Sequence, residues 1–381
     1  MSGLQFNLDR TASLELQIER QLRSNIRSGR LVPGQRLPST AQLARQCRVS
    51  CRSIQRVMER LDAGGLVGRT RKRGTIVKAA TEKAMIAILV GVSLNDERSF
   101  FYRALVKLIQ SEIHDASRND PAVSDDSRPW NWFGRVYDGL NLQQNPDELR
   151  ASAQYQSLVS DVLLNPLKGV ITIALEHELA PSFPLLANAP RVVWTTESPD
   201  VFMDLQHFAQ ASAEYVGRLG AKRIVLFHTV ERVPRVEAGL KALENTAREQ
   251  GMARPEVVQF QSVHRGASLE KEGYERACEL IRNAKATGEW PDALLVSDDV
   301  AMRGVAFALL QHGIEVPRRL RVITFASEGT DIHYPVPVVR YLVRLPVVAR
   351  RMLEILLERV AGRSVPNLPD LFRGELVAPE N

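Results

Sequence analysis

The chain has 381 residues, which is too long for one compact core and fits two or three domains. Hydrophobic residues make up 44% and charged residues 25%, ordinary globular values that exclude wholesale disorder. The charge is uneven, because residues 1–80 hold 16 Lys and Arg against 5 Asp and Glu, whereas the remainder holds 34 against 39. A basic segment of this kind is typical of a nucleic-acid-binding domain.

Targeting and redox signals are absent from the sequence pattern. The first ten residues lack the charged and apolar parts of a signal peptide. The longest apolar run, Ala84 to Val92, is about half of what a membrane span requires. Cys47, Cys51 and Cys278 form no CxxC pair and have no metal-ligand spacing. We therefore expect a cytoplasmic protein with free thiols, no metal, no cofactor and no membrane association.

The first 77 residues predict three helices followed by a basic hairpin. Apolar residues recur every four positions from Leu14 to Ile26, as on the buried face of a helix. Ser39 and Ser50 are suitable N-caps for a second and a third helix. Residues 66–77 then predict two short strands joined by a basic turn. This order is the outline of a winged helix-turn-helix.

The third helix is the expected reading helix, since the second helix of a helix-turn-helix pair lies in the major groove. Its apolar positions face the core, which leaves the polar ones to contact DNA. Arg suits guanine and Gln suits adenine, while the basic hairpin suits the minor groove or the phosphates. The candidate DNA-binding residues are Ser39, Thr40, Gln42, Ser50, Arg52, Ser53, Gln55, Arg56, Arg71, Lys72, Arg73 and Gly74.

About 65 residues of this segment resemble the gluconate-repressor (GntR) family of winged-helix regulators. The resemblance rests on Gly29-Arg-Leu-x-Pro33-Gly-x-x-Leu37-Pro38-Ser39, on Leu43-Ala44, on Val49-Ser50 and on Gly74-Thr-Ile-Val77. It implies binding to a double-stranded DNA operator. We expect a DNA-binding domain at residues 1–77 and a polar linker at 78–83.

Residues 84–381 alternate between strands and helices, which predicts an α/β fold of two doubly wound lobes with parallel sheets. Residues 118–146 fit neither period, and we expect mostly loop there. The expected strands are 85–92, 169–175, 191–195, 223–227, 293–296 and 321–325. The expected helices are about 100–116, 148–164, 204–219, 234–250, 269–286, 300–312 and 346–360.

This second part resembles the effector domain of the lactose/galactose repressor family, which shares its fold with periplasmic sugar-binding proteins. The resemblance is strongest in Ser297-Asp-Asp299-Val-Ala-Met-Arg-Gly304 and in Val216-Gly-Arg-Leu-Gly220. It implies a sugar or related metabolite bound in a cleft between the two lobes. The candidate effector-binding residues are Phe100, Phe101, Glu176, Arg235, Asp298 and Asp299.

The candidate effector residues also have purely structural explanations. The two aspartates sit at the carboxyl end of a predicted strand, where ligands bind in open α/β sheets, but an Asp there also caps the next helix. Phe100 and Phe101 can stack on a sugar or a base, or they can pack in the core as residues of a helix face. The sequence leaves both explanations open.

Other classes of function find little support. The sequence has no catalytic motif such as a P-loop, GxSxG or HExxH. A winged helix fused to a pyridoxal-phosphate enzyme-like domain lacks a candidate Schiff-base lysine, and a solute-binding sensor without gene control does not explain the basic N-terminus. We expect a homodimeric repressor (less favoured, an activator) that dimerises mainly through the sensor lobes and is not an enzyme.

Overall fold

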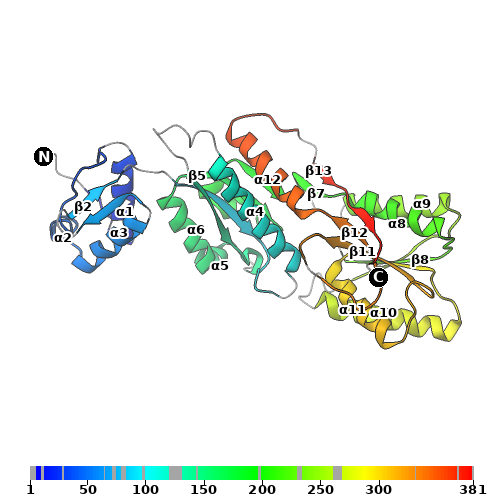
Figure 1. Ribbon diagram of the computed structural model, residues 1–381. Coiled ribbons are helices and arrows are strands. Elements are labelled where there is room, and N and C mark those ends of the chain that lie inside the picture. The colour runs from blue at the N-terminus through cyan, green and yellow to red at the C-terminus, as the bar shows by residue number, and fades with distance from the viewer. Residues whose placement is uncertain are drawn as a thin grey trace. The chain divides into compact units, whose positions relative to one another are not determined.

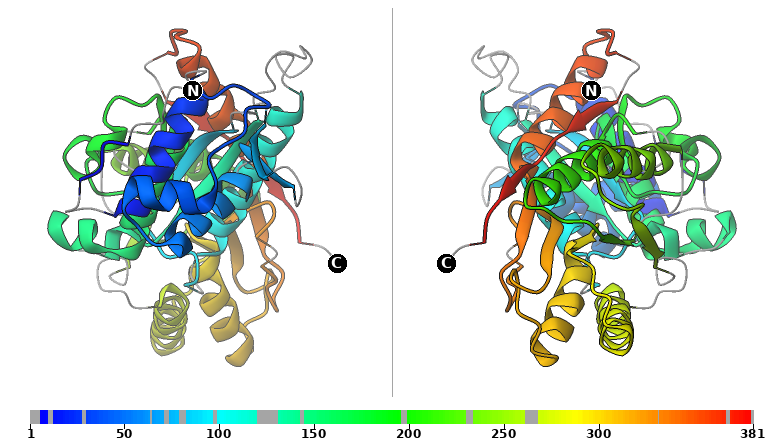
Figure 2. Two further views of the ribbon diagram at one scale, coloured as in Figure 1. Left: turned by 90° about the vertical axis from the view of Figure 1, so that its left-hand side faces the viewer. Right: turned by 90° about the vertical axis from the view of Figure 1, so that its right-hand side faces the viewer.

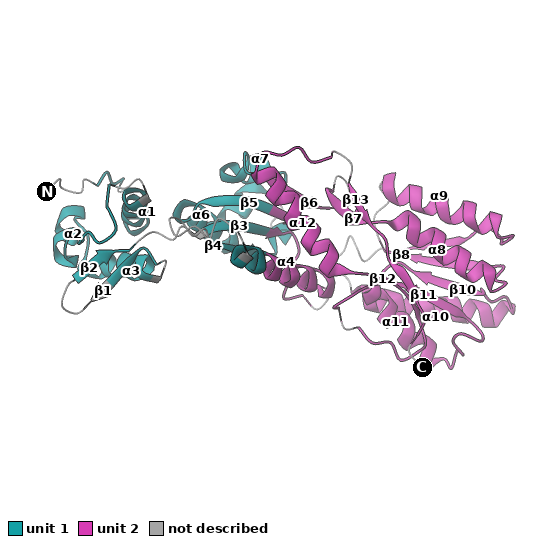
Figure 3. Cartoon of the chain, turned by 45° about the horizontal axis from the view of Figure 1, so that its top comes forward, with its two compact units in different colours: residues 1–88, 113–170, 177–189 teal, residues 89–112, 171–176, 190–381 magenta. Residues whose placement is uncertain are grey.

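A computed structural model gives the fold of the chain. It describes residues 6–9, 13–27, 30–63, 65–70, 74–78, 83–96, 99–119, 131–142, 145–195, 199–229, 234–260, 268–330, 332–366 and 369–379. The chain divides into two compact units (Figure 3). Unit 1 comprises residues 1–88, 113–170 and 177–189, and unit 2 comprises residues 89–112, 171–176 and 190–381.

The N-terminal part of unit 1 is a winged helix-turn-helix, as the sequence predicts (Figure 1). Its antiparallel strands pair from Val67↔Val77 to Thr70↔Gly74. A core of buried Ile, Leu, Val and Met side chains joins all three helices to the wing. The elements are α1 (Leu14–Arg27), α2 (Thr40–Cys47), α3 (Cys51–Ala63), β1 (Val67–Thr70) and β2 (Gly74–Val77).

The next part of the chain forms a four-stranded sheet in the order β4-β3-β5-β6. Its central strand β3 is fully apolar from Ala84 to Val90 and is buried, as expected for a strand covered on both faces. The strands are β3 (Lys83–Val90), β4 (Asn131–Tyr137), β5 (Leu167–Ile173) and β6 (Arg191–Trp194). The accompanying helices are α4 (Phe100–Asn119), α5 (Pro146–Ala151), α6 (Ala153–Leu164) and α7 (Leu179–Ser182), with the 3-10 turns η2 (Leu140–Leu142) and η3 (Pro184–Leu186).

A second sheet in unit 2 has the order β14-β12-β11-β10-β8-β9 and is parallel except for its edge strand β14. Helices α8 and α9 cover one face, and α10 and α11 cover the other (Figures 1 and 2). The strands are β8 (Ile224–His228), β9 (Glu256–Gln259), β10 (Ala293–Val296), β11 (Arg321–Ser327), β12 (Val339–Val343) and β14 (Glu375–Val377). The helices are α8 (Leu205–Arg218), α9 (Pro234–Glu249), α10 (Leu269–Thr287), α11 (Asp299–Gln311) and α12 (Leu345–Val360). This is the doubly wound arrangement that the sequence predicts.

Two short strands, β7 (Val201–Met203) and β13 (Asp370–Phe372), form a separate parallel pair. None of the described helices combines the length and the apolar character that crossing a bilayer requires.

The approach of α10 to α11 depends on two glycines. A Cβ added to Gly304 of α11 would lie 1.8 Å from the backbone oxygen of Glu270. One added to Gly273 of α10 would lie 2.2 Å from the backbone oxygen of Ala301. The two helices therefore meet backbone against backbone, which any larger residue at either position prevents.

The expectation of loop over residues 118–146 is wrong in part, since Asn131 to Tyr137 form the edge strand β4. Tyr137 anchors it, because this side chain is buried and its hydroxyl donates to Asp161 at 2.7 Å. The single helix expected at 148–164 is two helices. Ser152 between them is extended at φ −66° and ψ 148°, and its hydroxyl accepts from the Tyr155 N–H as the N-cap of α6.

Candidate DNA-binding and effector sites

The start of α2 is fixed by a capping box. The Ser39 hydroxyl accepts from the Gln42 N–H at 3.3 Å, and the Gln42 side chain accepts from the Ser39 N–H at 2.8 Å. Both residues are exposed, and Thr40 beside them is half-buried. Ser39 and Gln42, two of the predicted DNA contacts, therefore also stabilise the N-terminal end of α2, the first helix of the helix-turn-helix pair.

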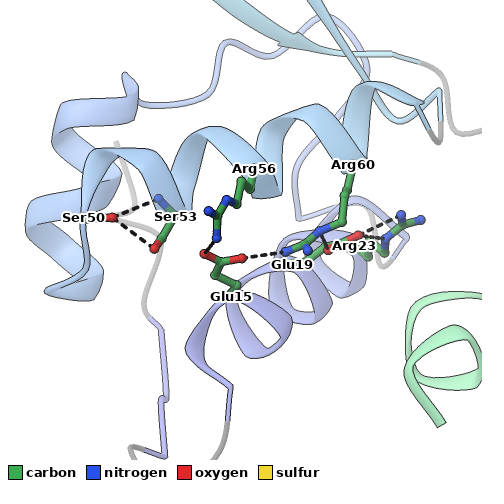
Figure 4. A network of polar contacts seen from close by, with 7 residues as sticks. All are labelled: Glu15, Glu19, Arg23, Ser50, Ser53, Arg56 and Arg60. Carbon is green, nitrogen blue, oxygen red and sulfur yellow. Dashed lines mark hydrogen bonds and ion pairs between the residues drawn. The ribbon is translucent and has the colours of Figure 1, made fainter. Parts of the chain in front are cut away.

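The reading helix α3 begins with a similar cap. The Ser50 hydroxyl accepts from the Ser53 N–H at 3.0 Å and lies 3.1 Å from the Ser53 hydroxyl (Figure 4). Arg52 and Gln55 follow in the first turn and a half, and both are exposed. Ile54 between them is fully buried. The first turns of α3 thus present Arg52 and Gln55 on the face opposite the core.

An ion-pair network ties α3 to α1 (Figure 4). Arg56 lies 3.4 Å from Glu15, and Arg60 lies 3.4 Å from Glu15 and 2.6 Å from Glu19. Glu19 is fully buried and also pairs with Arg23 at 3.0 Å. Arg56, a predicted DNA contact, is exposed but also forms an ion pair with Glu15 of α1. The ion pairs of Arg60 with Glu15 and Glu19 therefore hold α3 against α1.

The wing is only partly described. Arg71, Lys72 and Arg73, the predicted wing contacts, lie outside the described residues. Gly74 follows them at φ 76°, a conformation that strongly favours glycine. A Cβ there would also lie 3.1 Å from the Arg36 guanidinium, so exposed Arg36 lies against the wing.

Asp298 and Asp299 stand between β10 and α11, where the sequence expects them. Asp298 Oδ1 accepts from the Ala301 N–H at 2.8 Å, which makes it the N-cap of α11. Asp299 is buried, and its carboxylate accepts from the Thr330 hydroxyl at 3.4 Å. The Tyr334 hydroxyl donates to the Asp299 backbone oxygen at 3.2 Å. Both the structural and the functional explanation of this pair are therefore compatible with its geometry.

Burial acts strongly on the two aspartates. It raises the pKa of Asp298, and burial with the neighbouring Asp298 charge raises the pKa of Asp299 to about 7. Burial and the Asp298 charge also raise the pKa of Tyr102 to about 12. Tyr102, at the start of α4, therefore lies within electrostatic reach of the start of α11.

Phe100 has two cations near its ring. The Arg103 guanidinium is 4.8 Å and the Arg303 guanidinium 5.6 Å from the centroid of the Phe100 ring. Arg303 belongs to α11, the helix that Asp298 caps. These contacts bring the predicted residue Phe100 to the helix that carries the two aspartates.

Phe101 belongs to a continuous series of ring contacts that we call the aromatic row: Tyr102, Phe101, Trp194 and Phe202. Successive ring centroids lie 5.2, 5.5 and 5.2 Å apart. Arg235 at the start of α9 lies over the last ring, with its guanidinium 5.5 Å from the Phe202 centroid. The aromatic row therefore connects two predicted residues, Phe101 and Arg235, that are far apart in the sequence.

Glu176 is exposed in the loop after β5 and does not belong to the aromatic row. Trp194, Phe202 and Thr330 were not predicted from the sequence, although the aromatic residues of β6 and β7 offered a signal. Arg45 and Arg48 are exposed at the end of α2, beside the turn that leads to α3.

Comparison with known proteins assigns both parts of the chain. Residues 14–77 match the family described as bacterial regulatory proteins, gntR family, and residues 213–378 match the periplasmic binding protein-like domain. The HTH-type transcriptional repressor MelR of Bacillus subtilis is 21% identical over 340 residues, which cover 85% of this chain and 92% of that protein.

Solved structures share the fold. The transcription regulator CcpA of Lactococcus lactis superposes with a TM-score of 0.56 at 14% identity, over 78% of this chain and 98% of that chain. A LacI family transcriptional regulator from Arthrobacter sp. FB24, in complex with lactose, gives a TM-score of 0.54 at 16% identity, over 78% and 99%. The chain is therefore a DNA-binding transcriptional regulator that joins a gntR-family domain to a periplasmic binding protein-like effector domain.

Proposed function

We propose that the chain is a repressor that reads a near-palindromic operator through α3 and whose operator affinity is set by a small molecule. The observation that carries the DNA-reading part is the exposure of Arg52 and Gln55 on the first turns of α3, while Ile54 is fully buried. Arg pairs with guanine and Gln with adenine in the major groove. Phosphate contacts then position α2 and α3 on the DNA. These contacts come from the wing residues and from Ser39, Thr40, Gln42, Ser50 and Ser53.

The effector site, in this proposal, consists of Phe100, the aromatic row, Arg235 and the aspartates at the start of α11. Rings that stack on a sugar and carboxylates that accept from its hydroxyls are the usual means of binding such ligands. The lactose complex of the Arthrobacter regulator, which has the same fold, supports a polyhydroxylated ligand. Repression is supported by the likeness to the repressor MelR.

The functional unit, we infer, is a homodimer, because two-fold protein symmetry matches a two-fold operator. The DNA-binding domain spans residues 1–77 and the effector domain residues 84–381, with 78–83 as the linker. Since the DNA is in the cytoplasm of a bacterium, the protein acts there. The effector must bind one conformation more tightly than the other for operator affinity to change.

The test is selection of genomic fragments by the purified full-length protein at near-physiological salt, from the organism that encodes it. We expect a few fragments that share a palindrome, one protein dimer per site, and release of those fragments by a metabolite related to the flanking genes. The double variant Arg52→Ala/Gln55→Ala should lose this enrichment. Recovery of random fragments, equal for the variant, would exclude sequence-specific regulation through α3.

A further inference from the structure

Arg235 is a half-buried cation, and one of its donor atoms lies buried without an acceptor among the described residues. Its Nη1 atom is buried and has no hydrogen-bond partner among the residues that the structure describes. Burial lowers the pKa of this guanidinium, and no carboxylate among the described residues is found to raise it. Buried polar groups in folded proteins almost always have hydrogen-bond partners, and a guanidinium offers five N–H donors. The described residues around Arg235 therefore leave Nη1 without a hydrogen-bond acceptor.

The contact of Arg235 with the aromatic row does not supply one. The Phe202 ring, 5.5 Å away, attracts the face of the guanidinium through its negative π surface. The N–H groups lie in the guanidinium plane, so a stacked arginine still presents its donors to a planar acceptor such as a carboxylate or to a phosphate.

The other cations near the row differ from Arg235 in this respect. Arg103 donates to the backbone oxygens of Leu94 and Asp96 at 3.3 and 3.4 Å. Arg303 pairs with Glu270 at 3.6 Å. Their charges or donors have acceptors within the protein, whereas Nη1 of Arg235 has none among the described residues.

We propose that the effector carries an anionic group, a carboxylate or a phosphate, that binds Arg235 at the Phe202 end of the aromatic row. The inference rests on the proposed function, because it names the chemical class of ligand for the same effector site. It separates this chain from regulators of the same fold that bind neutral sugars such as lactose.

The acidic residues of the site do not oppose this assignment. Asp298 and Asp299 belong to the α11 side of the site and already accept from Ala301 and Thr330. Because burial keeps Asp299 partly protonated near neutral pH, its negative charge toward a ligand is reduced. A ligand with hydroxyl groups for the aspartates and one anionic group for Arg235, such as a sugar acid or a sugar phosphate, satisfies both ends.

The experiment compares the full-length wild type with Arg235→Gln and Arg235→Lys. The matched control is Arg254→Gln, a highly exposed arginine of the same unit that pairs with Glu244. Melting temperatures are measured in chloride, acetate and phosphate at equal ionic strength. Binding is then measured by calorimetry for three matched probes: glucose, glucuronate and glucose 6-phosphate. The carboxylate and phosphate arms show which anion the site prefers.

In chloride, we expect Arg235→Gln to raise the melting temperature, because it removes a half-buried cation whose Nη1 has no acceptor among the described residues. Acetate or phosphate should stabilise the wild type more than Arg235→Gln, and Arg254→Gln should behave as the wild type does. An anionic probe that binds should lose about 10- to 100-fold in affinity in Arg235→Gln and less in Arg235→Lys.

A lower melting temperature for Arg235→Gln in chloride, together with equal anion effects on both proteins, would overturn the proposal. Tighter binding of glucose than of glucuronate and glucose 6-phosphate would do so as well. The fragment selection described above is independent of these results. Sequence-specific fragments released by a neutral sugar would therefore reject the anionic ligand and leave the regulator function intact.

Discussion

The guanidinium of Arg60 in α3 lies 2.6 Å from the carboxylate of Glu19 in α1, and this carboxylate is fully buried. Arg23 pairs with the same carboxylate from one turn further along α1. One buried negative charge is thus held by two arginines, only one of which belongs to the reading helix (Figure 4). The orientation of α3 depends on charge pairing as well as on the apolar core.

Replacing Glu19 by alanine should destabilise the winged helix by about 3–5 kcal/mol, because Arg23 is then left buried without its partner. Hydrogen exchange of the α1 and α3 amides measures this loss directly. Glu59→Ala, an exposed position of α3, serves as the control and should change little. Unchanged exchange in the Glu19 variant would mean that apolar packing alone holds the two helices together.

Arg52→Ala and Gln55→Ala should each cost about 1–3 kcal/mol on the best operator sequence and much less on unrelated DNA. Lys72→Ala, in the wing sequence, should weaken binding to all sequences alike and flatten the salt dependence. Competition binding with operator and scrambled duplexes separates these effects. An equal loss on both duplexes for the α3 variants would contradict the assignment of α3 as the reading helix.

Arg48→Gly should stabilise the winged helix by about 0.5–1 kcal/mol. Arg48 closes α2 in the left-handed conformation, at φ 52° and ψ 49°, where a side chain is strained and glycine is not. The control is Arg45→Gly, inside α2, which should destabilise by about 1 kcal/mol. Both are measured by hydrogen exchange in α2, and a loss of stability in both variants would refute the strain at Arg48.

Asp299→Asn should change how stability depends on pH. Burial and Asp298 raise the pKa of Asp299 to about 7, whereas the unfolded value is about 3.9. Between these values the unfolded chain binds fewer protons than the folded one, so this residue makes stability fall as pH rises toward 7. The melting temperature of the variant should therefore exceed that of the wild type by a margin that grows from pH 5 to pH 7. Above pH 7 the difference in melting temperature should stay constant. Exposed Asp147→Asn should leave the profile unchanged, and a constant difference at every pH would contradict the shift.

Gly304→Ala should destabilise unit 2 by at least about 1–3 kcal/mol, because its Cβ would lie 1.8 Å from the Glu270 backbone oxygen. Gly239→Ala in α9 is the matched control, since its Cβ would approach no closer than 3.4 Å, an ordinary contact. The control gains helix propensity and should be neutral or stabilising. Trp290 and Trp194 fluorescence during urea unfolding provides the measurement, and equal stability of both variants would contradict the close approach.

The winged helix was predictable from sequence because its signals are local. Apolar residues recur at helical spacing from Leu14 to Ile26, and Ser39 followed by Gln42 has the sequence pattern of a capping box. The strands that escaped prediction lack such signals. β4 lies within a segment rich in Asp and Pro and contains a glycine and an arginine, and β12 has an arginine at its second position. Short edge strands such as β13 and β14 are determined by their neighbours in the fold.

The proposed effector site divides in the same way. The position of Asp298 and Asp299 after β10 was predictable, because a buried strand followed by acids marks the carboxyl end of the strand. The link from Phe101 to Arg235 through Trp194 and Phe202 was not predictable, because it joins four elements (α4, β6, β7 and α9) by tertiary contact alone. Sequence patterns identify candidate residues one at a time. Only the fold shows which of them form hydrogen bonds or ring contacts with one another.

The paired glycines of α10 and α11 also bear on motion. Where side chains separate two helices, rotamer changes let one helix slide past the other, but at Gly273 and Gly304 the backbones of the two helices approach each other directly. We therefore expect the two helices to move together. A molecule that moved the first turn of α11 at Asp299 should move α10 as well.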